Sequence, residues 1–251
     1  MRYADSTVLV TGGASGLGRA VAHAMARAGA VVVVADLPGS AGAVGELGDR
    51  VRFVPTDVTD AEQVRAAVAE ASSGSPLRAV ICCAGIATPG RILGKQGPLP
   101  TADFARVVQV NLVGTFTVLS LAAAAMAANE PVDGDRGVIV CTASIAAFDG
   151  QIGQAAYAAS KGGVASLTLS AARDLAEHAI RVVTIAPGLF DTPLLAGLPE
   201  AARVSLGQTV PHPPRLGDPA EFAALVMHIL DNRMLNGEVI RLDGALRMPP
   251  R

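Results

Sequence analysis

The sequence contains no tryptophan, and aromatic residues make up only 3% of its 251 positions. Large rings therefore cannot dominate the core, and small residues must do much of the packing. Charged residues are also sparse, at 17%, and the formal net charge is −2. This balance argues against a general electrostatic grip on nucleic acid or on an anionic membrane. The hydrophobic fraction of 51% still supplies ample material for a core.

Cysteine is scarce as well, with only Cys82, Cys83 and Cys141. Their spacing matches neither a disulfide framework nor a metal site, so we expect no bound metal. All three lie in apolar stretches, which predicts buried free thiols in a reducing compartment. No uninterrupted apolar run is long enough to span a bilayer. Residues 1–6 lead directly into an apolar run and leave no room for a signal or transit peptide. We therefore expect a soluble, cytoplasmic protein without a membrane partner.

What the chain does contain is an alternation of short apolar runs and helical patterns along its whole length. Runs such as 31–35 have the continuous hydrophobicity of buried parallel strands. The predicted strands are 7–10, 31–35, 51–55, 79–83, 137–142, 181–186 and 238–242, and the predicted helices are 19–28, 60–71, 103–126, 157–176 and 218–230. This order predicts one α/β domain over residues 1–251, with a doubly wound parallel sheet covered by helices on both faces. Proline and glycine interrupt residues 189–215, which predicts a mobile lid.

A glycine-rich turn, Thr11-Gly12-Gly13-Ala14-Ser15-Gly16-Leu17-Gly18, joins the first strand to the first helix. Such a turn can place backbone N–H groups against a pyrophosphate, where the helix dipole also favours negative charge. Gly12, Gly16 and Gly18 differ in spacing from the common G-x-G-x-x-G fingerprint. They still fit a tight turn, a close phosphate approach and close helix–strand packing. Alone, the turn is a weak indication of a nucleotide.

Asp36 strengthens that indication because it ends the second predicted strand. A carboxylate there can accept hydrogen bonds from the adenosine ribose and repels a 2′-phosphate. No arginine follows Asp36 or replaces Gly13, so the sequence favours NAD over NADP. The alternative is that Asp36 only caps the turn 37–39. Asp57 and Val58 fit the edge and face of an adenine, although Asp57 or Thr59 can equally start the next helix.

Tyr157 and Lys161 lie one helical turn apart on one face. A free tyrosine titrates near pH ~10, and a nearby ammonium lowers that pKa. The pair can exchange a proton with an alcohol oxygen, but a half-buried tyrosine and a solvated lysine often fall at this spacing. Ser144 follows a strand, at the edge where open α/β sheets bind ligands. Asn111 lies in an apolar helix and needs partners if buried; a locally satisfied core asparagine is the alternative.

Together, Thr11-Gly12-x-x-x-Gly16-x-Gly18, Asn111, Ser144 and Tyr157-x-x-x-Lys161 resemble the short-chain dehydrogenase/reductase family over essentially the whole chain. Finer motifs look like the type II 3-hydroxyacyl-CoA dehydrogenases, also called 17β-hydroxysteroid dehydrogenase type 10. These motifs are Asp36-Leu37-Pro38, Gln154-Ala155-Ala156-Tyr157, 185–190 and 235–245. The resemblance implies a Rossmann-fold homotetramer of fatty acid metabolism. Its members transfer hydride between NAD and C3 of a 3-hydroxyacyl-CoA or 3-ketoacyl-CoA.

The resemblance also implies residue roles. Tyr157 would be the acid/base, Ser144 would hold the substrate oxygen, and Lys161 would lower the tyrosine pKa and bind the nicotinamide ribose. Asn111 would fix a water linking Lys161 to solvent, and Gln154 would join Ser144 and Tyr157 in contacting substrate. Besides Tyr157 and Lys161, the implied cofactor contacts are Gly12, Ser15, Gly16, Leu17, Gly18, Asp36, Asp57, Val58, Cys83, Phe190 and Thr192. Cys82 departs from the asparagine usual in relatives, and we expect some loss of local hydrogen bonding without loss of activity.

Alternatives remain open. A dehydrogenase of this fold can act with NAD on a hydroxysteroid or another secondary alcohol. A different class is an NAD-binding scaffold or a nucleic-acid-associated subunit, against which the complete Asn-Ser-Tyr-Lys set speaks. Arg91 and Lys95, in a Gly/Pro-rich stretch, are either partners for an anionic substrate tail or solvated surface cations.

Overall fold

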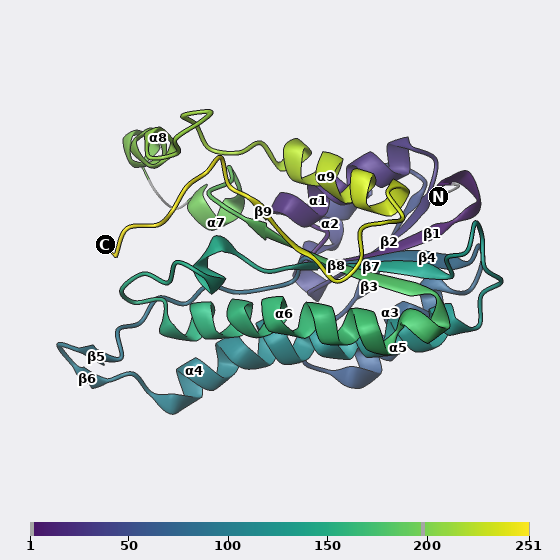
Figure 1. The fold of residues 1–251 in the computed structure, drawn as a ribbon, viewed down its shortest axis with the longest axis horizontal. Coiled ribbons are helices and arrows are strands. Elements are labelled where there is room, and N and C mark those ends of the chain that lie inside the picture. The colour runs from purple at the N-terminus through teal and green to yellow at the C-terminus, as the bar shows by residue number, and fades with distance from the viewer. Residues whose placement is uncertain (1–2, 197–198, 251) are drawn as a thin grey trace.

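The computed structural model describes residues 3–196 and 199–250. Its centre is a seven-stranded sheet in the order β3-β2-β1-β4-β7-β8-β9, with every neighbouring pair parallel. Helices cover both faces of this sheet (Figure 1). The predicted doubly wound α/β fold in a single domain is therefore confirmed.

The strands and helices have the following bounds. The sheet consists of β1 (Thr7–Thr11), β2 (Val31–Asp36), β3 (Val51–Pro55), β4 (Leu77–Cys82), β7 (Gly137–Thr142), β8 (Ile180–Pro187) and β9 (Val239–Leu242). The helices are α1 (Gly16–Arg27), α2 (Ala41–Gly45), α3 (Ala61–Ala71), α4 (Thr101–Val108), α5 (Gly114–Ala127), α6 (Ala155–Asp174), α7 (Pro193–Ala196), α8 (Glu200–Gln208) and α9 (Pro219–Asp231). A small hairpin pairs β5 (Leu93–Gly94) with β6 (Gly97–Pro98).

Every strand and helix expected from the sequence is present, with ends that differ by no more than three residues. The helix expected over 103–126 is interrupted by a π-helical turn, Gln109–Val113. The elements α2, α7, α8 and the β5–β6 hairpin were not expected, because they are short and lie in Gly/Pro-rich sequence. Residues 189–215, expected to form a lid, contain α7 and α8 beyond the end of the sheet (Figure 1). The mobility of this segment stays a prediction.

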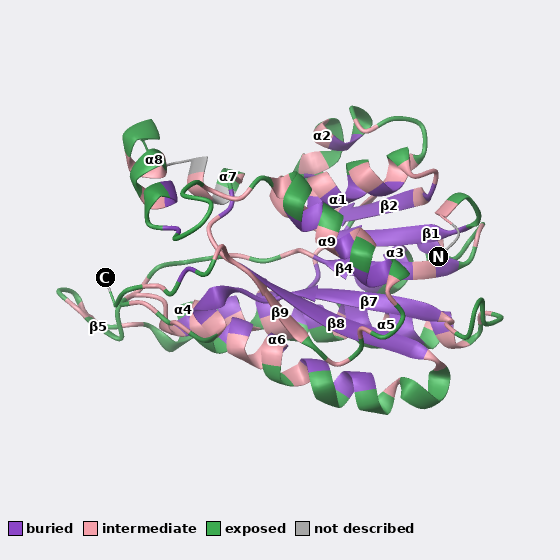
Figure 2. Ribbon diagram, turned by 45° about the horizontal axis from the view of Figure 1, so that its top comes forward, coloured by how far each residue is buried: buried purple, intermediate pink, exposed green. Residues whose placement is uncertain are grey.

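Two hydrophobic layers hold the helices to the sheet. α3, α5 and α6 pack on one face, while α1 and α9 pack on the other. The central strands are buried between them (Figure 2). Among the described residues, Phe190 and Phe222 are the buried aromatic side chains, and valine, isoleucine, leucine and alanine supply most of the rest. The expected reliance on small and aliphatic side chains is confirmed.

One helix bears on the membrane prediction. The continuous helix Thr101–Ala127 is long and apolar enough to cross a membrane, judged by length and composition alone. The expectation that no stretch reaches this length is therefore wrong. In this fold the α5 part of the helix buries Val118, Leu119, Ala122 and Met126 against the sheet. That core position accounts for its apolar composition.

The direction in which successive strands are added to the sheet reverses between β1 and β4. From β1 the chain moves outward to β2 and β3, then returns to β4 and continues to the opposite edge. At such a switch point the loops after two adjacent strands diverge and leave a crevice at the strands' carboxyl ends. Here the two loops begin at Gly12 and at Cys83, which places the glycine-rich turn beside the crevice.

Candidate active site

The glycine-rich turn packs too closely for side chains. A Cβ on Gly12, which has a φ of +67°, would lie 2.7 Å from the backbone nitrogen of Ala84 after β4. A Cβ on Gly18 would lie 2.2 Å from the carbonyl oxygen of Gly12. Glycine therefore permits both the tight turn and the close packing of α1 on β1. Ser15 stands at the N-cap of α1 without a side-chain capping bond, and Leu17 packs partly into the core.

Asp36 ties the glycine turn to the end of β2. Its Oδ2 accepts the N–H of Ala14 at 3.0 Å, and its Oδ1 accepts the N–H of Leu37 at 2.8 Å. Asp36 therefore caps the following turn, as the alternative interpretation held, and also faces the glycine turn. The fixed carboxylate at this edge is compatible with the predicted ribose contact.

Asp57 and Val58 have local roles. Oδ1 of Asp57 accepts hydrogen bonds from the N–H and hydroxyl groups of Thr59, at 2.9 and 2.7 Å. Asp60 caps α3 by accepting the N–H groups of Glu62 and Gln63, so the idea that Asp57 or Thr59 starts this helix is wrong. Val58 is 7% exposed, and its side chain packs beside Gly114 in the core. Its side chain is therefore less open to an adenine than the sequence suggested.

The segment after β8 crosses over the glycine turn. Thr192 lies beside Gly16, because a Cβ on Gly16 would be 3.4 Å from the Cβ of Thr192. Phe190 is buried and makes an edge-to-face contact with Phe222, with ring centres 6.4 Å apart. The structure thus places Thr192 at the crevice edge beside Gly16, while the Phe190 ring lies in the core.

Three predicted catalytic side chains converge at the ends of β7 and α6. Ser144 follows β7, and its hydroxyl lies close enough to Tyr157 to lower the pKa of the phenol. Lys161 is only 5% exposed, and its Nζ lies 5.8 Å from the centre of the Tyr157 ring. That Nζ donates a hydrogen bond to the Thr142 carbonyl at 2.8 Å. The arrangement can place a hydroxyl pair on one substrate oxygen, with a cation behind the tyrosine.

Burial governs the proton affinities of this group. Burial raises the pKa of Tyr157, while the hydrogen bond from Ser144 lowers it. The net direction is opposite to the one expected from Lys161 alone. Burial also lowers the pKa of Lys161 to about 8, with the neighbouring thiols acting in the opposite sense. The lysine can therefore change its charge near neutral pH.

Asn111 braces the site from the π-helical turn. It is fully buried; its Oδ1 accepts the N–H of Ile86 at 2.8 Å, and its Nδ2 donates to the Ile86 carbonyl at 2.9 Å. Nδ2 also lies 3.0 Å from the hydroxyl of Ser160, which donates to the Tyr157 carbonyl at 2.8 Å. Asn111 is thus satisfied, but by partners distant in sequence. It connects the loop after β4 to the helical turn that carries Tyr157, and the water relay stays a prediction.

The three thiols lie beneath this site. Cys82 and Cys141 are buried and occupy paired positions on β4 and β7. Cys83 is half-buried, with its Sγ 3.5 Å from the hydroxyl of Thr142, and burial raises its pKa to about 11. The expectation of free thiols is confirmed, with Cys83 less enclosed than expected. In the described part of the chain, no group of three or more His, Cys, Asp or Glu side chains could hold a metal ion.

The remaining predicted residues lie at the rim. Gln154 precedes α6, and its side-chain amide pairs with Gln151 at 3.3 and 3.4 Å. Gly90, at the base of the β5–β6 hairpin, donates to the carbonyl of Gly153 at 2.8 Å. The hairpin that bears Arg91 and Lys95 is therefore anchored beside the start of the Tyr157 helix. Both cations are exposed.

Sequence reasoning missed Thr142 and Ser160. Thr142 acts through its carbonyl, which every residue carries, so no sequence signal marks it. Ser160, between the two motif residues of α6, had a signal: a hydroxyl buried within an otherwise apolar helix face needs a partner.

Comparison with known proteins agrees with this geometry. A model of the short chain dehydrogenase family matches residues 6–203. The chain is 56% identical over 252 residues to 3-hydroxyacyl-CoA dehydrogenase type-2 of Drosophila melanogaster, covering 98% of this chain and 99% of the relative. Identity to the Homo sapiens protein of the same name is 53% over 248 residues, covering 96% and 95%. The crystal structure of 3-hydroxyacyl-CoA dehydrogenase type-2 from Mycobacterium avium matches with a TM-score of 0.95 and 42% identity, over 99% of this chain and 98% of that chain. The chain therefore belongs to the short-chain dehydrogenase family of oxidoreductases.

Proposed function

We propose that the protein is an NAD-dependent 3-hydroxyacyl-CoA dehydrogenase, which interconverts a 3-hydroxyacyl-CoA and a 3-ketoacyl-CoA. The observation that carries this proposal is the convergence of Ser144, Tyr157 and Lys161 at the crevice formed by the glycine-rich turn. The relatives at 53–56% identity that bear this enzyme name support the substrate class.

The chain's own residues account for the proton chemistry. In alcohol oxidation, Tyr157 acts as phenolate and takes the hydroxyl proton from the substrate oxygen. Ser144 and Tyr157 together stabilise the charge that develops on that oxygen. Lys161, held by the Thr142 carbonyl, favours the phenolate form electrostatically and opposes the effect of burial. The nicotinamide cofactor, when bound, supplies the hydride acceptor.

The residues of the first crossover fit a dinucleotide. Gly12 and Gly18 permit close backbone packing that a Cβ would prevent, and α1 begins within the glycine-rich turn, at Gly16, so the helix N-terminus lies at the turn. The Asp36 carboxylate at the end of β2 favours a free ribose 2′-hydroxyl over a 2′-phosphate. These features support NAD as the cofactor.

A homotetramer fits the exposed apolar side chains on the π-helical turn Gln109–Val113, on α5 and on α6. Phe116 is 50% exposed, Val113 38% and Leu169 47%. Exposed apolar clusters of this kind often mark protein–protein contacts. We propose that copies of this chain cover them, that the protein acts in fatty acid metabolism, and that its free thiols reflect a cytoplasmic location. The mass in solution, measured by light scattering, tests the assembly, and Phe116→Glu is expected to lower it.

The decisive experiment follows NADH oxidation with acetoacetyl-CoA at pH 7. Tyr157→Phe is expected to lower kcat by roughly 10²–10⁴-fold while NADH still binds. The chain has only one other tyrosine, Tyr3, whose hydroxyl bonds to Asp231 far from the site. Tyr3→Phe is therefore the matched control and should turn over at the wild-type rate.

The comparison of substrates separates the alternatives. A higher kcat/KM for a hydroxysteroid than for acetoacetyl-CoA would favour a steroid dehydrogenase. NADH binding without turnover of either substrate would favour a scaffold or another alcohol.

A further inference from the structure

Ser144 begins a short turn whose far end is held by another part of the chain. The Ser144 hydroxyl accepts the N–H of Ala146 at 3.1 Å, and residues Ile145–Ala147 form a 3-10 helix. The turn continues to Asp149, whose N–H donates to the carbonyl of Ile145 at 2.9 Å. A short series of hydrogen-bonded residues therefore connects Asp149 to Ser144.

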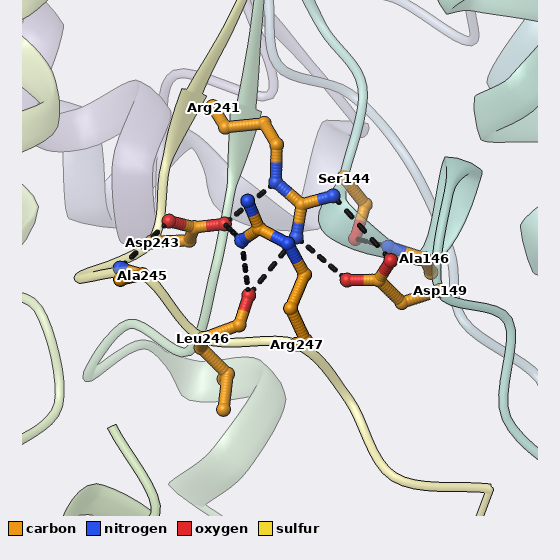
Figure 3. A network of polar contacts seen from close by, with 8 residues as sticks. All are labelled: Ser144, Ala146, Asp149, Arg241, Asp243, Ala245, Leu246 and Arg247. Carbon is orange, nitrogen blue, oxygen red and sulfur yellow. Dashed lines mark hydrogen bonds and ion pairs between the residues drawn. The ribbon is translucent and has the colours of Figure 1, made fainter. Parts of the chain in front are cut away.

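Arg241, near the end of β9, forms an ion pair with Asp149. Its Nη2 lies 2.6 Å from Oδ2 of Asp149, and its Nε lies 2.7 Å from Oδ2 of Asp243 (Figure 3). The guanidinium carbon also lies 5.2 Å from the centre of the Phe148 ring. The side chains of Arg241, Asp149 and Asp243 are 20%, 17% and 7% exposed. An arginine fork held between two largely covered carboxylates has a far more defined orientation than a surface ion pair.

The C-terminal tail closes the same network. Arg241 donates to the carbonyl of Leu246 at 3.0 Å, and Arg247 lies 3.1 Å from Asp243 (Figure 3). The Leu246 side chain is buried with Ile145, the first residue of the 3-10 helix, and with Val210 after α8. The tail therefore packs against the Ser144 turn as well as against the end of the predicted lid segment.

Two further hydrogen bonds extend this contact toward α6. The side chain of Gln151 donates to the carbonyl of Pro249 at 3.0 Å. The N–H of Ile152 donates to the carbonyl of Pro250 at 3.1 Å. The loop that leads from Ser144 to the Tyr157 helix thus lies along the tail, and Arg241 is the charged centre of the contact.

We propose that Arg241 is a positioning residue for Ser144, which it orients through Asp149 and the 3-10 turn. This inference rests on the proposed role of Ser144 as the group that holds the substrate oxygen. The contacts of Arg241 lie on the Ser144 side of the crevice, with none to the glycine-rich turn. Loss of Arg241 should therefore disturb the chemical step and leave NADH binding intact.

The first test compares Arg241→Gln, Asp149→Asn and Arg241→Lys with wild type. The first two are expected to lower kcat by about 10- to 100-fold, with smaller changes in KM and an unchanged NADH dissociation constant. Arg241→Lys keeps the positive charge but loses the planar guanidinium, and its kcat should lie between those of the first two variants and that of wild type. Arg52→Gln is the matched control, because it breaks an exposed ion pair with Glu70 remote from the site. A folded Arg241→Gln enzyme with wild-type kcat would overturn the proposal.

The second test is a double-mutant cycle with Ser144→Ala. If Arg241 acts through Ser144, Arg241→Gln should lower kcat by less than about twofold once Ser144 is absent. The same fold-loss in both backgrounds would show a general structural role and refute the proposal. Asp149→Asn, which is isosteric, runs the same cycle if Arg241→Gln does not fold.

The cycle also separates the two proposals. A Ser144→Ala enzyme with wild-type kcat would remove the catalytic role of Ser144, and this inference with it. If Ser144→Ala loses much of its kcat but the loss from Arg241→Gln is the same in both backgrounds, the role of Ser144 stands and the role of Arg241 is refuted.

The pH profile of kcat supplies an independent readout, because the Ser144 hydrogen bond lowers the pKa of Tyr157. Displacing Ser144 should raise the pKa of Tyr157 and so move the limb of the profile that reports Tyr157 ionisation to higher pH. If that limb does not move in a folded variant, Arg241 does not position Ser144.

Discussion

The two sides of the crevice are built in different ways. The side formed by β1, α1 and β2 relies on backbone contacts, such as the approach of Gly18 to the Gly12 carbonyl. The side formed by β7, α6 and β9 relies on polar side chains, such as the Arg241–Asp149 ion pair and the Asn111–Ser160 hydrogen bond. The contact of Gly18 with Gly12 joins residues close in sequence, whereas the two polar pairs join residues 92 and 49 positions apart.

This difference matters for function. Backbone contacts between glycines leave no side chain to exchange, so the first side offers one rigid surface to its ligand. Side-chain contacts can be strengthened, weakened or replaced one at a time. The second side, which carries the proposed acid/base and the substrate rim, is therefore the part in which single substitutions should separate catalysis from binding and from stability.

After Tyr157→Phe, the largest effect is expected from Lys161→Met, on the side of the crevice formed by β7, α6 and β9. The variant should lose about a hundredfold or more in kcat, because the cation beside Tyr157 is removed. It should also be more stable than wild type at pH 7, since a buried charge is replaced by an apolar side chain of similar length. Kinetics and urea unfolding measure the two effects. Lys95→Met alters the only other lysine, which is exposed, and should change neither.

The stability difference should depend on pH in a defined direction. Burial lowers the pKa of Lys161 from its ordinary 10.5 to about 8, so the unfolded chain holds this proton more tightly than the folded one. The free-energy penalty of burying this charge is fully present below pH 8 and amounts to about 3 kcal/mol. Between pH 8 and 10.5 the wild type should therefore gain stability relative to Lys161→Met. A gap that stays constant with pH would contradict the buried charge.

A smaller effect, on stability and on cofactor binding, is expected from Gly18→Ala on the side of the crevice formed by β1, α1 and β2. The new Cβ would meet the Gly12 carbonyl oxygen at 2.2 Å, and backbone atoms must move to relieve the contact. We expect a loss of about 1–3 kcal/mol in unfolding free energy together with weaker NADH binding. Gly42→Ala, in α2, meets no atom within 4 Å and is the matched control. Equal stability of the two variants would show that the backbone packing at Gly18 does not constrain the first side of the crevice.

The smallest effect concerns cofactor choice. Asp36→Asn keeps the size of the side chain that accepts the Ala14 and Leu37 N–H groups but removes its charge. NADH binding should weaken by about tenfold, and NADPH binding should improve relative to it, because repulsion of a 2′-phosphate is lost. Fluorescence titration with both cofactors measures the ratio. An unchanged ratio would show that Asp36 serves only the turn.

Much of this architecture could be predicted from the sequence, and the reason differs by residue. The apolar runs of β1 and β2 and the spacing of Tyr157 and Lys161 are local patterns that map directly onto a strand or a helix face. The helix predicted over 218–230 is also a local pattern, and Asp218 caps it by accepting the N–H of Ala220 at 2.8 Å. Such signals need no knowledge of distant parts of the chain.

Other features could not be predicted because they depend on distant partners or on burial. The helical pattern around Asn111 runs unbroken through the π-helical turn. The pairing of Arg241 with Asp149 leaves no mark in either local sequence. The spacing of Tyr157 and Lys161 suggested the electrostatic effect between them, but it carried no information on burial, which sets the direction of the tyrosine pKa.

The position of the C-terminal tail has a practical consequence for handling the protein. The carbonyls of Pro249 and Pro250 bond to Gln151 and Ile152, at the rim of the site. The tail residues lie against the Ser144 loop. A purification tag, fluorescent protein or linker attached after them would therefore lie next to the site and could disturb these contacts. The described N-terminus lies at the opposite end of the sheet (Figure 1). Attachment there leaves the catalytic edge free of any added mass.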